Sequence, residues 1–339
     1  MNIYGITRGK LEEYFLSIGE KKFKALQVFE WIYGKRTKTF DELSNIKKEV
    51  IERLKSDFVI ELPRLVKREI DNDTEKYLFL LSDGEHVEAV LMKHNYGVSV
   101  CVSSQVGCNM GCKFCESGRL KKRRNLSAHE MVGQILKIEE EANMRISSVV
   151  VMGIGEPFDN YDNLISFLDI INDPKGLAIG ARHITVSTCG IVPKIKEFSN
   201  YPLQVNLAIS LHASNNSLRD KLMPINKAYN MEVLKNAIEE YINKTNRRVT
   251  IEYILLKGIN DSVECAKELC DYLKGLNVYV NLIPYNETSH IEYLRSSKDT
   301  IDAFYNYLIS RHIQVTVRRE FGSSISAACG QLRSKVEEE

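Results

Sequence analysis

The spacing of apolar residues changes along the chain, and each change predicts a different kind of element. In the first sixty residues the apolar positions recur at helical intervals, as at 23–32 and 43–54, with Lys and Glu between them. Residues 34–37 have the composition of a turn between two helices. This part of the chain is therefore predicted to be a small helical accessory domain.

Between about residues 62 and 103 the apolar runs become short. They lie at 77–81, 87–92 and 98–102 and are interrupted by Asp83-Gly84 and Tyr96-Gly97. Short runs separated by turn residues are typical of antiparallel hairpins, so hairpins are predicted here.

Beyond residue 115, predicted strands alternate with predicted helices. Ser127 and Glu130 form a capping-box pattern that begins a helix ending near residue 142. Predicted strands follow at 148–152, 183–187, 205–211, 248–255, 278–283 and 313–317. The alternation predicts parallel βα units with right-handed crossovers, in a barrel or a doubly wound sheet, and both place ligands at the carboxyl ends of the strands.

Composition narrows the class of protein without indicating a partner. The chain has 339 residues, 44% of them hydrophobic, which is enough for a sizeable core. Lys and Arg number 46 against 45 acidic residues, so any basic surface must be local. The N-terminus lacks the pattern of a secretory signal, and no apolar run approaches the roughly 20 residues that span a bilayer. A cytoplasmic protein without membrane contact is expected.

Three of the eight cysteines, Cys108, Cys112 and Cys115, form a C-x3-C-x2-C motif. In a reducing compartment clustered cysteines usually bind metal or perform chemistry, and thiolates suit zinc or iron-sulfur clusters. A structural zinc site would need a fourth ligand, and the nearest histidine, His129, falls inside a predicted helix. The motif predicts an iron-sulfur cluster with one iron open to a ligand; zinc and unmetallated packing are the alternatives.

The sequence around this motif resembles the radical S-adenosylmethionine enzymes, and among them the RlmN/Cfr family of RNA adenosine methyltransferases. The matching strings are CVSSQVGCNMGCKFC (101–115), RNLS (124–127), MGIGEP (152–157), RHITVSTCGIVP (182–193), ISLHA (209–213), LMPIN (222–226), VNLIPYN (280–286), AACGQLR (327–333) and the N-terminal ALQVFEWIYGK (25–35). The resemblance implies an α/β fold, a partial (β/α)6 TIM-like barrel of the radical SAM type. It also implies a helical accessory domain over 1–60 that docks RNA, a β-hairpin extension over 61–100, a core over 101–333 and an acidic tail over 334–339.

The resemblance also implies the cofactors. They are one 4Fe-4S cluster on the three motif cysteines and two molecules of S-adenosylmethionine per turnover. One molecule supplies the methyl group, and an electron from the cluster converts the other into a 5'-deoxyadenosyl radical. The residues that match the family's cofactor site are Gly155, Glu156, Ser187, Ser210, Leu211, His212 and Asn286. By itself the glycine-rich turn could suggest a dinucleotide site, but Phe158 stands where the third glycine would be. A Ser or Asn at a strand end could equally be a turn or cap residue.

Three further residues match the family's catalytic residues. Cys329 matches the thiol that receives a methyl group. The carbon of that methyl group then becomes a radical and adds to an adenine ring. Cys101 matches the thiol that releases the RNA by forming a disulfide, and Glu88 matches the base that removes the ring proton. Without the resemblance, Glu88 would be interpreted as an exposed strand carboxylate and Cys101 as a buried strand residue.

The two branches of the family methylate different adenine carbons, and the sequence is similar to both. Phe321-Gly322 resembles the Cfr branch, which methylates C8, whereas Glu252 and the EWIY and RHITVSTCG strings resemble the RlmN branch, which methylates C2. C2 is favoured. Glu116-Ser117 replaces the usual Ala-Thr pair after the third cysteine. The expected RNA partner is 23S rRNA, with adenosine 2503 as the target, and adenosine 37 of tRNA remains an open second target. An electron donor such as flavodoxin is also expected, and the protein is expected to be a monomer.

Other interpretations of the same residues remain. Basic residues at 119–124 and in the N-terminal helices could contact phosphates or form a solvated run of charge. A radical enzyme acting on a small molecule or on tRNA alone would use the same cluster. A non-catalytic metal-binding or RNA-binding module could keep the same scaffold.

Overall fold

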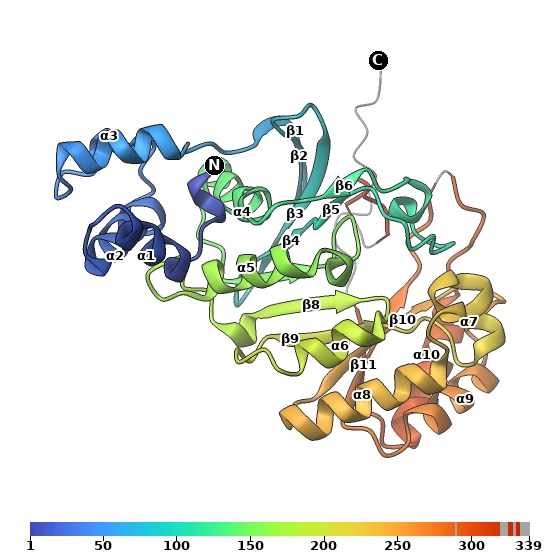
Figure 1. Ribbon diagram of the computed structural model, residues 1–339. Helices are drawn as coiled ribbons and strands as arrows, with labels where there is room; N and C mark the ends of the chain where they lie inside the picture. Colours follow the sequence, from blue (N-terminus) through green and yellow to red (C-terminus); the bar gives the residue numbers. More distant parts are fainter. Residues whose placement is uncertain (289, 319–324, 328–329, 333–339) are drawn as a thin grey trace.

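A ten-stranded sheet organises the computed structural model, which describes residues 1–288, 290–318, 325–327 and 330–332. The strands follow one another in the order β1-β2-β3-β4-β7-β8-β9-β10-β11-β12 (Figure 1). Their bounds are β1 Arg64–Asp71, β2 Thr74–Leu80, β3 His86–His94, β4 Gly97–Val102, β7 Ser148–Val151, β8 Ile184–Thr188, β9 Asn206–Ser210, β10 Val249–Leu255, β11 Val278–Pro284 and β12 Val315–Val317.

The strands β1 to β4 form an antiparallel meander, which confirms the predicted hairpins. Val90 of β3 pairs with Cys101 of β4, so the two side chains lie on the same face of the sheet. Glu88, two residues from Val90, shares that face, while Val87 and Ala89 point into the main hydrophobic core on the other.

From β4 to β12 every neighbouring pair of strands is parallel. The spatial order equals the chain order, so each crossover advances in the same direction and the order never reverses within the described residues. A doubly wound sheet needs such a reversal. The arrangement is therefore a barrel, left partial because β1 and β12 form its two edges.

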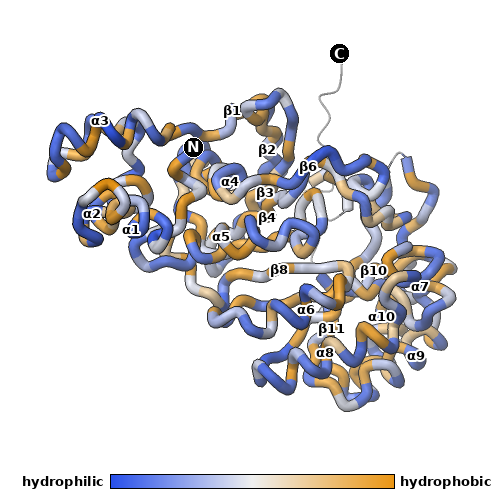
Figure 2. The backbone as a smooth tube through the Cα atoms, in the orientation of Figure 1, coloured by the Kyte–Doolittle hydropathy of each residue, from blue (hydrophilic) through white to orange (hydrophobic). Residues whose placement is uncertain are grey.

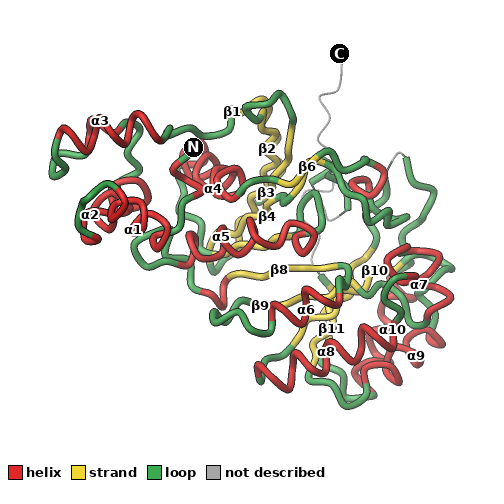
Figure 3. The backbone as a smooth tube through the Cα atoms, viewed as in Figure 1, coloured by secondary structure: helices red, strands yellow, loops and turns green. Residues whose placement is uncertain are grey.

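Helices cover the outer face of the parallel strands (Figure 3). They are α4 Ala128–Ala142, α5 Tyr161–Asn172, α6 Val192–Phe198, α7 Asn216–Leu222, α8 Met231–Thr245, α9 Val263–Leu273 and α10 Lys298–Ser310. The predicted capping box at Ser127 and Glu130 is present at the start of α4. Along α8 hydrophobic positions alternate with hydrophilic ones, as a helix with one packed face requires (Figure 2). Across the described residues, no helix combines the length and the apolar character needed to cross a membrane.

The first sixty residues are helical, as predicted, and pack beside α4 (Figure 1). Their helices are α1 Arg8–Ser17, α2 Lys22–Phe29, a π-helix Glu30–Gly34 and α3 Lys48–Asp57. Arg36 and Lys38 form ion pairs with Glu139 and Glu140 of α4, which link this helical region to the barrel. At the other end of the chain, the predicted acidic tail over 334–339 lies outside the described residues.

Candidate active site

The loop that carries the three motif cysteines is closed at its base by a small two-stranded sheet. β5 (Gln105–Val106) precedes the loop and pairs with β6 (Arg124–Asn125), which follows it. Inside this base the amide of Cys108 donates a hydrogen bond to the carbonyl of Leu120 at 2.9 Å. The local sequence therefore fixes where the first cysteine enters the loop.

Gly107 allows the close approach of the two sides of the loop. Its φ of +74° lies in the left-handed region, and a Cβ at this position would lie 2.3 Å from the carbonyl oxygen of Lys121. Any side chain would overlap backbone here, so this position requires glycine.

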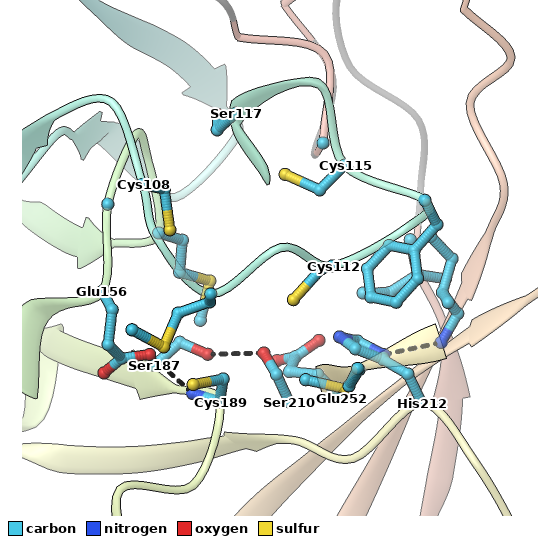
Figure 4. Close-up of a pocket in the computed structure, with 18 of the residues that line it drawn as sticks. Cys108, Cys112, Cys115, Ser117, Glu156, Ser187, Cys189, Ser210, His212 and Glu252 are labelled. Atoms are coloured by element: carbon cyan, nitrogen blue, oxygen red, sulfur yellow. Dashed lines mark hydrogen bonds between the residues drawn. The ribbon is translucent and has the colours of Figure 1, made fainter. Parts of the chain in front are cut away.

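The loop forms one side of a cavity with an empty volume of about 880 Å³ at the carboxyl ends of the parallel strands. Most of the sequence-predicted metal and cofactor residues line this cavity together: Cys108, Cys112, Cys115, Gly155, Glu156, Ser187, Ser210 and His212. Figure 4 shows the three cysteines of the loop on one side and Glu156, Ser187, Ser210 and His212 on the other. Of the remaining predicted cofactor residues, Leu211 packs in the main core and Asn286 is buried beyond the end of β11.

Burial makes the Cys108 and Cys112 thiols hard to ionise without a bound cation. Burial raises the pKa of Cys108 to about 12 and raises that of Cys112 well above its usual value. Among the described residues no three His, Cys, Asp or Glu side chains are arranged to hold a metal ion. In a 4Fe-4S cluster each thiolate instead binds its own iron, and the protons leave as the metal binds. Three soft sulfur donors from one loop at one cavity therefore suit such a cluster.

The turn that follows β7 is held against the segment that follows β4. The hydroxyl of Ser103 accepts from the amide of Ile154 at 2.9 Å, and the Gln105 side chain accepts from the amide of Glu156 at 2.9 Å. The Glu156 carboxylate in turn accepts from the amides of Phe158 and Cys189, at 2.9 and 2.8 Å, while burial raises its pKa. The carboxylate thus joins the ends of β7 and β8.

Polar side chains at the ends of β8 and β9 face the cavity. The hydroxyls of Ser187 and Ser210 lie 3.3 Å apart. His212 accepts a hydrogen bond from the amide of Ile254 through Nδ1 at 3.0 Å, and burial lowers its pKa to about 3. The imidazole is therefore neutral with its proton on Nε2, and it can donate one hydrogen bond to a ligand.

Cys101 lies beside this cavity in a second group of buried residues, which we call the Cys101 cluster. Its members are Val90, Met92, Cys101, Ile154, Ala327 and Leu332, with Met152 packed against them. Met152 also lines the cavity beside the cysteine loop, which we call the cofactor cavity after the sequence-predicted residues on its wall. The Cys101 cluster and the cofactor cavity therefore adjoin. The alternative interpretation of Cys101 as a buried strand residue agrees with its 9% exposure.

Glu88 is not the exposed strand carboxylate that its sequence alone indicated. It is only 4% exposed, because the inner face of β3 is covered as well as the outer one. Its backbone carbonyl accepts a hydrogen bond from the Ser103 hydroxyl at 2.6 Å.

Cys329 and Phe321-Gly322 lie outside the described residues. The described residues on either side of Cys329 approach both groups: Ala327 belongs to the Cys101 cluster, and Gly330 lines the cofactor cavity. The carbonyl of Gly330 accepts from the amide of Glu116 at 2.8 Å. The Ser117 hydroxyl donates to the carbonyl of Leu332 at 2.7 Å, so the Glu116-Ser117 pair anchors the C-terminal segment.

Sequence reasoning did not place Glu252 or Arg219 in the site. Glu252 lines the cavity from β10, is 4% exposed and accepts from the side chain of Asn281 at 2.9 Å. Arg219 is fully buried and donates to the carbonyls of Cys189 and Leu211, which follow β8 and β9. The sequence signal for Glu252 is a charged residue in the largely apolar strand β10, whereas Arg219 lies in the mostly polar helix α7 and has no such signal.

Much of the basic run after the cysteine loop forms contacts within the protein. Arg124 pairs with Asp83 and Glu130, and Lys122 pairs with Asp159 at 2.7 Å. These pairs stabilise the loop base, so this run is not simply a solvated charge cluster.

Comparison with known proteins agrees with this geometry. The family model described as the radical SAM superfamily matches residues 102–273, and the model described as the ribosomal RNA large subunit methyltransferase N-terminal domain matches residues 1–60. A protein of Acholeplasma laidlawii named probable dual-specificity RNA methyltransferase RlmN is 53% identical over 336 residues, covering 99% of each chain. The chain belongs to the RlmN family of radical SAM enzymes. A relative of the same name from Listeria welshimeri is 55% identical, covering 98% of this chain and 94% of its own.

The solved structures include a close relative of this RlmN family member. The crystal structure of a radical SAM methyltransferase from Sphaerobacter thermophilus is 40% identical, with a TM-score of 0.93, and covers 99% of this chain and 100% of its own. The predicted family and the radical SAM type of fold are thereby confirmed. Membership of the radical SAM family implies an iron-sulfur cluster and S-adenosylmethionine.

Proposed function

We propose that this protein is a radical SAM methyltransferase that places a methyl group on C2 of an adenosine in RNA. The proposed target is adenosine 2503 of 23S rRNA, with adenosine 37 of tRNA as a second substrate. One observation carries the proposal: the cofactor cavity and the Cys101 cluster adjoin through Met152, within a chain similar along its whole length to RlmN proteins.

The proposed cofactors are one 4Fe-4S cluster and two molecules of S-adenosylmethionine per turnover. Cys108, Cys112 and Cys115 would hold the cluster. The turn at Gly155 and Glu156 and the side chains of Ser187, Ser210, Leu211, His212 and Asn286 would hold S-adenosylmethionine. When bound, the pair supplies the methyl group and the radical chemistry. The chain itself positions these groups and excludes water from them.

Cys329 is the proposed methyl carrier. A thiolate there displaces the methyl group from sulfonium, and the same carbon later bonds to the adenine ring. The proposal is supported by the two described residues that bracket Cys329 in sequence. Ala327 lies in the Cys101 cluster, and Gly330 lies on the wall of the cofactor cavity.

Cys101 and Glu88 are the proposed releasing groups. Glu88 accepts the proton that leaves the ring carbon. The Cys101 thiolate then attacks the sulfur of Cys329, so that a disulfide forms and the freed methylene carbon takes up a proton. Their shared position on the inner face of β3 and β4 supports this pairing of roles.

The cofactor cavity is not the only hollow among the described residues of the barrel. A second cavity, with an empty volume of about 1690 Å³, lies toward the opposite ends of the strands. Met152, Glu252 and Arg318 line both cavities, so the two cavities adjoin at these side chains.

The helical region over 1–60 is the proposed RNA-docking domain. It matches a family model described as a ribosomal RNA large subunit methyltransferase N-terminal domain. It also exposes Lys21, Lys22, Lys47 and Lys48, which can contact phosphates.

Mapping the methylated carbon tests the proposal. The cluster-reconstituted enzyme is incubated with reductant, S-adenosylmethionine carrying a deuterated methyl group, and unmodified 23S rRNA, and digested nucleosides are analysed by mass spectrometry. The expected product is 2-methyladenosine. A label on C8 would overturn the C2 assignment in favour of the Cfr-like reaction, and no labelled adenosine would overturn the methyltransferase proposal.

A further inference from the structure

Arg219 of α7 is fully buried although its side chain is charged. Its guanidinium donates to the carbonyl of Cys189 at 2.7 Å and to the carbonyl of Leu211 at 3.3 Å. It also donates to the side-chain oxygen of Asn226 at 3.1 Å and to the carbonyl of Tyr229 at 3.3 Å. All four of these acceptors are neutral. Because a charge that is removed from water costs free energy without an anionic partner, packing alone does not explain an arginine here.

Two of the four acceptors lie just beyond strand ends that face the cofactor cavity. Cys189 follows the end of β8 and is two residues from Ser187. Leu211 directly follows Ser210, the last residue of β9. Figure 4 shows Cys189 beside Ser187 and Ser210, across the cavity from the cysteine loop. Since the donors of a guanidinium form a rigid planar fork, one side chain that binds both carbonyls holds the two strand ends in a fixed relation.

The helix that carries Arg219 also holds the cysteine loop. Leu222 is the last residue of α7, and its carbonyl accepts a hydrogen bond from the amide of Lys113 at 2.9 Å. Lys113 lies between the second and third motif cysteines. Phe114, the next residue of the loop, belongs to the same buried group as Leu222 and Cys189. Through its own helix, Arg219 therefore connects the cysteine loop to the ends of β8 and β9.

We infer that Arg219 is a positioning residue that fixes the distance between the cysteine loop and the side chains of Ser187 and Ser210. The inference rests on the proposed function, in which the loop holds the cluster and the two serines hold S-adenosylmethionine. A ligand that must reach both the open iron and the serines binds less tightly when their separation changes. Arg219 does not itself line the cavity, so it acts through the backbone of α7, β8 and β9.

A spectroscopic titration tests the inference. The cluster of the reconstituted protein is reduced with dithionite, S-adenosylmethionine is added in increasing amounts, and each sample is frozen at once for electron paramagnetic resonance. Binding at the open iron alters the spectrum of the reduced cluster. Arg219→Lys keeps the charge but loses the planar fork. Its half-saturating concentration of S-adenosylmethionine is expected to rise about tenfold to a hundredfold, as is typical when a residue that supports a ligand from behind is changed.

Arg219→Met is the second variant, because it removes the buried charge that lysine would keep with fewer partners. It is expected to weaken binding to a similar extent. The iron content of both variants should equal that of the parent protein, since the base of the cysteine loop is unchanged. Arg247→Lys is the matched control. Arg247 also donates to two carbonyls, those of Leu203 and Val205 at 3.1 and 2.9 Å, but these precede β9 at the end away from the cofactor cavity.

The outcomes separate this inference from the function on which it rests. If either iron-loaded variant binds S-adenosylmethionine at the concentration that the parent protein needs, Arg219 has no positioning role and the proposed function stands. Loss of iron from both variants would assign Arg219 to the formation of the loop and would likewise overturn the inference. If S-adenosylmethionine leaves the spectrum of the parent protein unchanged, the proposed cofactor site fails and the inference fails with it.

Discussion

His212 shows how burial determines the chemistry of a single side chain. Its backbone adopts a left-handed φ of +55° at the end of β9, and its ring packs edge-on against Phe114 of the cysteine loop at 4.8 Å. Burial, together with the positive charge of Arg219, lowers its pKa to about 3. The imidazole therefore remains a neutral hydrogen-bond donor across the working pH range.

The buried histidine makes folding stability depend on pH. In the unfolded chain the group has its ordinary pKa of 6.5, so below that pH the unfolded state binds a proton that the folded state does not. Stability is complete above pH 6.5 and falls as pH decreases toward 3. At pH 5.5 the cost is about 1.4 kcal/mol relative to a non-titrating residue.

His212→Asn should remove this dependence, because Asn can still accept from the amide of Ile254. Unfolding of both proteins is followed by denaturant titration at pH 7.5 and pH 5.5. The stability difference between parent and variant is expected to shift by about 1.4 kcal/mol in favour of the variant at the lower pH. An unchanged difference would show that His212 is protonated in the folded protein.

The sequence could predict single residues only where a local pattern marks them. The motif spacing marked Cys108, Cys112 and Cys115, and the structure places all three on one cavity. The alternation around Glu88 indicated one buried face, but the cover on its other face comes from the distant turn and C-terminal segment near Ile154 and Ala327. Long-range cover of this kind is not encoded in a local pattern.

At the scale of elements, the cysteine loop depends on the close contact of its two sides. Ala at a left-handed φ costs roughly 1–2 kcal/mol wherever it is placed. At Gly107 it would also overlap the Lys121 carbonyl. The base of the loop would then have to open, which would displace Cys108.

Gly107→Ala is therefore expected to lose its bound iron. Gly19→Ala is the matched control, since its φ of +77° is similar but a Cβ there would meet no atom within 4 Å. Gly19→Ala should lose roughly 1–2 kcal/mol of stability, and Gly107→Ala should lose more because of the added overlap, as measured by denaturant unfolding. Iron content after reconstitution should fall only in Gly107→Ala, and equal iron in the two would contradict the role of the loop base.

Element types and positions could be predicted closely, but their arrangement could not. The strand predicted over 248–255 is observed as Val249–Leu255, and the one over 278–283 as Val278–Pro284. The pattern left a barrel and a doubly wound sheet open, because the order of strands depends on pairing between distant segments. The unreversed strand order of the structure decides for the barrel.

At the scale of the whole molecule, ion pairs join the N-terminal helical region to the barrel. Arg36 pairs with Glu139 of α4, where the two side chains are 39% and 12% exposed. Pairs of this exposure contribute little to stability and are screened by salt. Most of the attachment must then come from apolar packing, such as that of Ile3 and Tyr4 in the main core.

A double-mutant cycle on Arg36→Ala and Glu139→Ala tests this division. The coupling free energy should be about 0.2–1 kcal/mol in dilute buffer and should shrink at high salt. Thermal or denaturant unfolding of the four proteins provides the measurement. A coupling of several kcal/mol would show that the pair, rather than the packing, joins the two regions.

The central claim is that two thiols outside the cluster loop carry and release the methyl carbon. Its most direct test is the Cys101→Ala variant, reconstituted with its cluster and given reductant, S-adenosylmethionine and 23S rRNA. Denaturing gels and mass spectrometry of the RNA-bound peptide should show a covalent protein–RNA adduct joined through Cys329, and Cys329→Ala should form neither adduct nor product. Normal turnover by Cys101→Ala, or an adduct at another residue, would contradict the account.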